Sequence, residues 1–142
     1  FYSDLSRINI IIGELLANAI RFTKHLELPE IQVRIYANPH KVTIRIGDNG
    51  EGIPSDELPK IFDMFYRGSE SSQGSGLGLY IVKNAVNKLN GMVYVTSEEG
   101  AGTTFTVELP NEAKSYNQMN SNEISDQENP LKKTPLPERD QR

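Results

Sequence analysis

Three polar side chains, Glu14, Asn18 and Arg21, follow one another at spacings of four and then three residues. On a helix, this spacing places them on one face. The amide oxygen suits Mg²⁺, and the guanidinium would neutralise phosphate charge, so this face could hold a phosphate and its metal ion. The same spacing also fits an exposed polar face, where each helix pair contributes only about 0.2–0.5 kcal/mol.

A second group of chemically suited residues lies in segment 48–54. Asp48 is in phase with the alternating Val42, Ile44 and Ile46, so its carboxylate is expected to point to the core face. A carboxylate in that position needs a hydrogen-bond donor. An adenine amino group would be such a donor, with neighbouring isoleucines as apolar walls. The alternative is a plain turn in which Asp48 caps its own loop.

Three glycines, Gly74, Gly76 and Gly78, surround the start of a predicted helix at Leu77. Successive glycines expose backbone N–H groups, and the start of a helix adds positive partial charge, so the segment could cradle a phosphate. No Gly-Lys-Ser/Thr follows, which excludes a P-loop, and no strand leads into the segment as a dinucleotide-binding loop requires. A plain glycine-rich linker remains the alternative.

An aromatic segment, 61–67, lies between these two loops and precedes a run of small and polar residues, 68–73. An aromatic anchor followed by a flexible run is typical of a lid over a ligand, and Arg67 could reach a phosphate when the lid closes. The alternative is a packed helix followed by an ordinary surface loop. Further along, segment 100–104 could bring a hydroxyl near Asp48, although a tight hairpin there needs no ligand.

Apolar periodicity indicates which elements hold these groups in place. Ser3 or Asp4 can cap a first helix. Ile31, Val33 and Ile35 alternate with polar residues, as in a half-buried strand. The expected elements are a first helix that includes 8–19, strands at 31–36 and 42–46, a short helix from 55, a long helix at 77–90, and strands at 92–96 and 103–109. Because no βαβ rhythm appears, the pattern favours an α+β two-layer sandwich with a mostly antiparallel sheet.

The composition limits the class of protein. The chain has 142 residues, no cysteine and a formal net charge of −4. The lack of cysteine excludes disulfides and thiolate metal sites, and a cytoplasmic setting is the simpler expectation. The mild negative charge argues against nucleic-acid binding, and no apolar run is long enough to span a membrane. His25 and His40 stand alone near a helix end and in a turn, where histidines are usually solvated.

The composition changes after Pro110, where the chain becomes rich in Asn, Ser, Gln, Glu, Lys and Pro. Such a segment cannot bury enough apolar surface to offset its ordering entropy. We therefore expect a folded domain at 1–110 and a disordered polar tail at 111–142. The alternative for the tail is a docking segment that becomes ordered on a partner. The first residue is not Met, which suggests a piece of a larger protein.

Taken in order, the segments resemble the ATP-binding catalytic domain of sensor histidine kinases. This domain belongs to the wider group that includes gyrase, the heat-shock-90 chaperone and MutL-type ATPases. Residues 14–23 resemble its N-box, 48–53 its first glycine box, and 61–67 its F-box, which is a feature of histidine kinases in particular. Residues 74–79 and 100–105 resemble the two later glycine boxes. The resemblance implies the Bergerat-type fold, a sandwich of a mixed, mostly antiparallel sheet and three helices.

The resemblance also implies roles for individual residues. Asn18 would hold Mg²⁺, Arg21 would face the phosphates of ATP, and Asp48 would bind the adenine amino group. Phe22 would lie beside the adenine, and Thr104 would support that end. The remaining expected nucleotide-binding positions are Gly50, Gly52, Ile53, Tyr66, Gly74, Gly76, Leu77 and Gly78, of which Gly76 and Gly78 would lie against the phosphate chain.

Two residues are expected to take part in catalysis, Glu14 and Arg67. Arg67 would approach the phosphates from the lid. Many histidine kinases have Asn where this chain has Glu14, whereas gyrase-like ATPases use a Glu there to activate water. Glu14 could therefore act as a general base toward water or toward a histidine nucleophile.

The implied activity is transfer of the γ-phosphoryl group of Mg·ATP to a histidine in two-component signal transduction. The acceptor histidine is expected on a dimerisation domain outside this chain, with a response regulator as an indirect partner. The parent would be a homodimer and could be anchored in the inner membrane with this domain on the cytoplasmic side. This chain itself is expected to be soluble and monomeric. The alternatives are a stand-alone ATPase, a serine kinase of the anti-sigma type, or a degenerate domain kept for binding.

Overall fold

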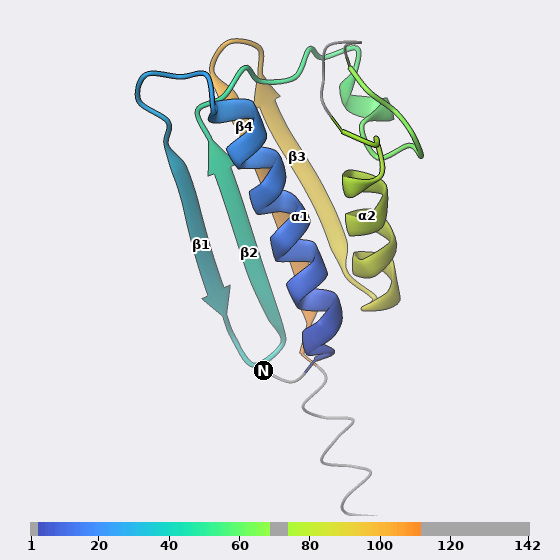
Figure 1. The fold of residues 1–142 in the computed structure, drawn as a ribbon. Coiled ribbons are helices and arrows are strands. Elements are labelled where there is room, and N and C mark those ends of the chain that lie inside the picture. Colours follow the sequence, from blue (N-terminus) through green and yellow to red (C-terminus); the bar gives the residue numbers. More distant parts are fainter. Residues whose placement is uncertain (1–2, 69–73, 112–142) are drawn as a thin grey trace, which may run out of the picture. The chain divides into compact units, whose positions relative to one another are not determined.

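The computed structural model describes residues 3–68 and 74–111. In these ranges, two α-helices lie over one face of a four-stranded sheet whose strand order is β1-β2-β4-β3 (Figure 1). The elements are α1 (Leu5–Thr23), β1 (Ile31–Ala37), β2 (Lys41–Asp48), the 3-10 helix η1 (Leu58–Lys60), α2 (Gly78–Lys88), β3 (Met92–Glu98) and β4 (Gly102–Pro110). The tail predicted at 111–142 lies outside the described residues beyond Asn111, as do residues 69–73 of the lid run.

Helix α1 begins where the sequence predicts. The side chain of Asp4 accepts a hydrogen bond of 3.1 Å from the backbone N–H of Arg7, which caps the first turn. The buried face of the helix consists of Ile11, Leu15, Ala19 and Thr23. The Thr23 hydroxyl donates a 2.8 Å hydrogen bond to the carbonyl of Ala19, so this buried polar group is satisfied.

The core lies between the helices and the inner face of β2 and β4. These strands pair antiparallel, with Ile46 opposite Phe105, Ile44 opposite Val107 and Val42 opposite Leu109. All six side chains are buried, and Val82 and Val86 of α2 close the layer from the other side. Because side chains alternate along a strand, the residues between them project toward the opposite face of the sheet. The predicted α+β two-layer sandwich is confirmed.

Two details of the expected fold are wrong. All three strand pairings in the described ranges are antiparallel, so the sheet is not mixed there. The short helix expected from residue 55 is only a turn followed by η1. Pro59 lacks an amide proton, and a segment this short does not recover the cost of helix nucleation. The described residues therefore contain two α-helices rather than three.

Strand β1 is less buried than its alternation suggests. Val33 and Ile35 were expected on a half-buried face, but their exposed fractions are 47% and 59%. They share the inner face with Ile46 and Ile44, their partners on β2. β1 lies at the edge of the sheet, and in Figure 1 both described helices lie over the other strands.

None of the described helices is long and apolar enough to cross a membrane.

The packing of α1 makes a prediction for stability. Leu15 is 1% exposed in the core, so Leu15→Ala should lower the free energy of unfolding by about 2–5 kcal/mol through lost contacts and a cavity. Ile20 lies on the same helix but is 58% exposed, so Ile20→Ala should change the free energy of unfolding by less than about 1 kcal/mol. Urea unfolding of both variants checks this, and equal losses would contradict the placement of the buried face.

Candidate functional site

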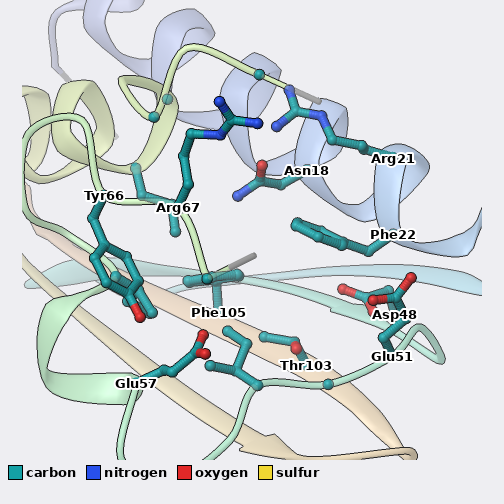
Figure 2. A pocket seen from close by; sticks show the side chains of 18 of the residues that line it. Asn18, Arg21, Phe22, Asp48, Glu51, Glu57, Tyr66, Arg67, Thr103 and Phe105 are labelled. Atoms are coloured by element: carbon teal, nitrogen blue, oxygen red, sulfur yellow. The ribbon is translucent and has the colours of Figure 1, made fainter. Parts of the chain in front are cut away.

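A cavity of about 340 Å³ opens where α1, the start of α2, the end of β2 and the start of β4 meet segment 52–68 (Figure 2). It gathers residues that are far apart in the sequence. Twelve of the fifteen positions singled out from the sequence line it: Glu14, Asn18, Arg21, Phe22, Asp48, Gly52, Ile53, Tyr66, Arg67, Gly74, Gly76 and Gly78. The fold therefore brings the polar face of α1, the first glycine loop after β2 and the glycine segment before α2 together around one cavity.

The polar face of α1 lies against the glycine segment that precedes α2. A Cβ atom added to Gly78 would lie 2.7 Å from Oε2 of Glu14, and one added to Gly74 would lie 2.7 Å from Nη1 of Arg21. Both atoms are the ends of flexible side chains, so a larger residue at either position would push the carboxylate or the guanidinium away. The two glycines thus let the Glu14 carboxylate and the Arg21 guanidinium rest directly on the backbone.

The second glycine segment is joined to the F-box by its backbone. The N–H of Phe65 donates a 3.0 Å hydrogen bond to the carbonyl of Gly76. Both residues have positive φ, 64° and 70°, and a Cβ on Gly76 would lie within 3 Å of the Phe65 backbone. A phenylalanine in this region is unusual and costs conformational energy, which is typical of functional loops. This contact holds together the two stems that lead into the undescribed segment 69–73.

Asp48 lies at the end of the cavity formed by the sheet. Its Oδ1 accepts a 2.9 Å hydrogen bond from the N–H of Gly50, and the backbone N–H of Thr103 also donates to its carboxylate. Partial burial nevertheless raises the pKa of Asp48 above its ordinary value, because the loss of hydration outweighs the two hydrogen bonds. The carboxylate thus lines the cavity with less hydration than it would have in water.

The middle of the cavity is apolar. Phe22 from α1 and Phe105 from β4 face this space in Figure 2. Phe105 is only 4% exposed and contacts Phe62 edge-on, with ring centroids 6.3 Å apart. Ile53 and Leu79 add aliphatic surface. Two aromatic side chains and aliphatic walls make a slot suited to a flat apolar ring.

The F-box side of the cavity carries Tyr66 and Arg67. The Tyr66 hydroxyl is hydrogen-bonded to the carboxylate of Glu57, which also lines the cavity. Loss of hydration raises the pKa of Tyr66, and the charges of Glu57 and Asp56 add to this effect. Figure 2 shows the Tyr66 ring turned toward Glu57, whereas the Arg67 side chain extends toward Asn18.

The arginines that line the cavity lie at one end of it, where Glu14 of the same helix face is the accompanying carboxylate. Figure 2 shows the guanidinium groups of Arg21 and Arg67 gathered near Asn18 at one end. The carboxylates of Asp48 and Glu51 lie together near the sheet at the other end. A ligand that suits both ends carries negative charge at one end and hydrogen-bond donors at the other.

Three predicted positions do not line the cavity: Gly50, Leu77 and Thr104. Gly50 still supports the cavity through its hydrogen bond to Asp48. The expectation for Thr104 needs a correction, because β4 places the side chain of Thr104 on the other face of the sheet, where its Oγ1 lies against Gly47. Thr103 lines the cavity instead, in phase with Phe105. Strict alternation from Phe105 would have identified it.

Other residues that line the cavity were not expected from the sequence. They are Glu51, Pro54, Glu57, Ile61, Gly68, Ser75, Leu79, Glu99, Thr103 and Phe105. The glutamates come from turns and loops, where no periodicity indicates the direction of a side chain. Within 3–68 and 74–111, no three or more His, Cys, Asp or Glu side chains form a group that could hold a metal ion.

Comparisons with known proteins agree with this geometry. Residues 3–113 match the family model of the histidine kinase-, DNA gyrase B- and HSP90-like ATPases. The chain is 40% identical over 119 residues to the autoinducer 2 sensor kinase/phosphatase LuxQ of Vibrio parahaemolyticus, covering 77% of this chain and 14% of LuxQ. It is 36% identical over 111 residues to the sensor protein kinase WalK of Staphylococcus haemolyticus, covering 75% of this chain and 18% of WalK. The chain thus spans less than a fifth of either relative.

Solved structures give the same result. The mycobacterial sensor histidine kinase MprB superimposes with a TM-score of 0.67 at 32% identity, covering 76% of this chain and 74% of that one. Full-length ShkA in complex with AMPPNP superimposes with a TM-score of 0.66 at 30% identity, covering 76% of this chain and 22% of that one. The chain therefore belongs to the histidine kinase-, DNA gyrase B- and HSP90-like ATPase family, as a catalytic ATP-binding domain of the sensor histidine kinase type.

Proposed function

We propose that this cavity binds Mg·ATP and that the bound nucleotide donates its γ-phosphoryl group to a histidine of an acceptor domain. The observation that carries the proposal is the placement of both lining arginines at one end of the cavity, away from Asp48. Arg21 and Arg67 lie at one end, Asp48 lies at the other, and the aromatic slot lies between them. An aminopurine ring in the slot, with its amino group toward Asp48 and its triphosphate toward the two arginines, matches this order.

The adenine end rests on Asp48. The pKa of its carboxyl group is raised because burial removes hydration that the hydrogen bonds from Gly50 and Thr103 do not fully replace, and the amino group of adenine would supply a further donor. Phe22 and Phe105 would contact the faces and edge of the ring. The ShkA structure, which resembles this chain at 30% identity, contains AMPPNP, an analogue of ATP. This supports a nucleotide as the ligand of the same fold.

The phosphate end would be held by Asn18, Arg21 and Arg67. Mg²⁺ prefers oxygen ligands and is usually bound by one or two protein groups together with phosphate oxygens. The donor set fits this pattern, since the amide oxygen of Asn18 lines the cavity next to the two guanidinium groups. The ion would neutralise phosphate charge. The protein side chains would position the chain of phosphates and exclude water.

Phosphoryl transfer requires an acceptor and a base. The bond between the γ-phosphorus and the leaving oxygen of ADP would break as a bond to an imidazole nitrogen forms, and the imidazole proton would pass to a base. Glu14 lines the cavity against Gly78 and is suited to receive that proton. Neither His25 nor His40 lines the cavity, so the acceptor would come from a separate domain.

The same position of Glu14 favours a second candidate function, hydrolysis of ATP by a water molecule that Glu14 activates.

The expected partners follow from the first candidate function, phosphoryl transfer to a histidine. They are a dimerisation and acceptor domain, and a response regulator that would take the phosphoryl group from it. We place the domain on the cytoplasmic side of the parent protein, where ATP is available. Relatives such as LuxQ and WalK are much longer than this chain, which supports additional domains.

Asp48→Asn tests the adenine end. Hydrogen bonds to a charged group contribute about 1.5–3 kcal/mol, so ATP affinity should fall about 10- to 100-fold, whereas GTP affinity should change little. Calorimetric titration measures both. Asp63→Asn removes an exposed carboxylate outside the cavity and serves as the matched control. An equal loss of ATP and GTP binding would contradict the role of Asp48.

Asp48→Asn also has a predicted pH dependence. The pKa of Asp48 is raised in the folded protein, so its ionised form disfavours folding at neutral pH, and protonation restores stability as pH falls through the raised pKa. At about pH 7 the D48N variant should therefore melt at least as high as the unmodified chain. This advantage should shrink as pH falls toward about 4, the ordinary pKa of the group. A melting temperature that drops at neutral pH and recovers in acid would refute the burial argument.

Asn18→Ala tests the metal end. In the unmodified chain, Mg²⁺ should strengthen ATP binding, and in N18A this strengthening should fall about 10-fold or more, because a ligand is lost. Calorimetric titrations with ATP, one set in Mg²⁺ and one in EDTA, give the ratio of the two dissociation constants, which measures this strengthening. Asn9→Ala changes the same residue type on an exposed position of α1 and should leave the ratio unchanged. An unchanged ratio in N18A would rule out the Mg²⁺ assignment.

Glu14→Gln tests the base. A general base contributes about 10²- to 10⁴-fold to a rate, so phosphorylation of an acceptor domain supplied with this chain should slow by that factor while ATP affinity stays similar. Radiolabel transfer from ATP to the acceptor measures the rate. Glu27→Gln, an exposed glutamate outside the cavity, is the control. A normal transfer rate in E14Q would exclude the role of Glu14 as a base.

A further inference from the structure

Ser97, near the end of β3, joins two loops that form the adenine end of the cavity. Its hydroxyl oxygen lies 2.8 Å from the backbone nitrogen of Ile53 in the first glycine loop. It also lies 2.9 Å from the carbonyl oxygen of Gly102 and 2.8 Å from Oγ1 of Thr103, both at the start of β4. Ser97 itself does not line the cavity, so it acts on the site only through these neighbours.

The chemistry of the three partners fixes where the protons lie. A serine hydroxyl has one proton to donate and two lone pairs to accept with. The carbonyl of Gly102 can only accept, so it takes the Ser97 proton, and the N–H of Ile53 can only donate, so it occupies one lone pair. The remaining contact, with the Thr103 hydroxyl, must use the second lone pair of Ser97. Thr103 is therefore the donor in this hydrogen bond.

These hydrogen-bond directions determine whether the Thr103 hydroxyl can donate to a ligand in the cavity or only accept. Its hydroxyl has a single proton, which Ser97 engages, so only lone pairs remain for a ligand or for a bridging water. Thr103 is 7% exposed and lines the cavity beside Asp48, to which its backbone N–H donates. The carboxylate of Asp48 also only accepts when ionised. Both side chains at this end thus accept hydrogen bonds and donate none.

We propose that Ser97 is a positioning residue which, by binding the hydroxyl proton of Thr103, keeps the adenine end of the cavity free of side-chain donors and so selects 6-aminopurine over 6-oxopurine nucleotides. The inference rests on the proposed binding of ATP at this site. A 6-oxopurine such as hypoxanthine presents a carbonyl where adenine presents an amino group. Against two acceptors that carbonyl finds no donor, and leaving it unpaired costs binding energy.

Ser97→Ala releases the Thr103 hydroxyl, which can then rotate and donate to a 6-oxo group. The preference of the chain for ATP over ITP, measured as the ratio of two dissociation constants in calorimetric titrations, should fall about tenfold. Ser97→Thr retains a hydroxyl and should keep the ratio of the unmodified chain. Thr96→Ala, at the neighbouring exposed position on the other face of β3, should also leave the ratio unchanged.

A double-mutant cycle separates this role from general support of the loops. In a Thr103→Val background there is no hydroxyl to orient, so adding Ser97→Ala should leave the ratio of ATP to ITP affinity as it is in T103V alone. If Ser97 only holds the loops together, Ser97→Ala will weaken ATP and ITP equally in both backgrounds, and that result overturns the inference. Failure of the unmodified chain to bind ATP overturns the proposed function itself.

A measurement on the unmodified chain covers the case in which Ser97→Ala does not fold. A Thr103 hydroxyl proton held by Ser97 should exchange slowly with water and be visible by NMR, with a cross-peak to the Ser97 side chain. A Thr103 hydroxyl that exchanges as fast as that of exposed Thr96 would overturn the inference, because its proton would then be free.

Discussion

The site depends on a close backbone contact between the loop after β2 and the hairpin that joins β3 to β4. A Cβ atom on Gly52 would lie 2.0 Å from the carbonyl oxygen of Glu98, and one on Gly102 would lie 2.1 Å from that of Asp48. Both glycines have positive φ, 72° and 123°. No other residue type fits at either position without moving the backbone. This interlock holds Asp48 and Thr103 side by side, and the cavity is built on it.

Helix α1 supplies the wall of the cavity that the sheet does not form. Strand β2 ends in Asp48 at the same end of the molecule where α1 presents its polar face, so one side of the cavity contributes acceptors and the other contributes cations (Figure 2). The backbone carbonyl of Phe22 lies close to Gly50, where a Cβ would be 2.8 Å away, so α1 is fixed against the same loop. One side of the cavity is therefore formed by the sheet and α1. The other side is the F-box and the glycine segment, joined through Phe65 and Gly76.

Sequence periodicity predicted the parts of this structure in which one buried face sets the pattern. The alternation of β2 and the cap at Asp4 are confirmed. The apolar stripe expected on α1, Ile8, Ile12, Leu15, Leu16 and Ala19, is confirmed in part: Leu15 and Ala19 are buried and the other three are partly buried against the core, but the fully buried Ile11 was missed. Periodicity gave wrong predictions where the surrounding tertiary structure determines whether a residue is buried. Val33 and Ile35 alternate like core residues, yet they lie on an edge strand where no described helix covers them. The short helix after Pro54 failed because local propensity does not show that a segment is too short to propagate.

The site was predictable in the same uneven way. Glu14, Asn18 and Arg21 share a helix face by spacing, and Asp48 follows the strand period, so their convergence on one cavity could be foreseen. The segment 100–104 points to a hydroxyl near Asp48 without indicating which threonine carries it, and only the two-residue period from Phe105 favours Thr103 over Thr104. Glu57 and Glu99 lie in irregular segments, where no pattern gives the side-chain direction. The hydroxyl network of Ser97 joins residues 44 positions apart and has no signature in a single sequence.

The central claim is that one ligand spans the cavity from Asp48 to Arg21, with its purine at the sheet and its phosphates at α1. NMR titration of the labelled chain with Mg·AMPPNP, and then with adenosine, tests this most directly. The account predicts that Mg·AMPPNP perturbs Asp48, Gly50, Asn18 and Gly78 together, whereas adenosine perturbs Asp48 and Gly50 but leaves Asn18 and Gly78 unchanged. Perturbation of Asn18 by adenosine with Asp48 unaffected, or no perturbation of the cavity by Mg·AMPPNP, would contradict it.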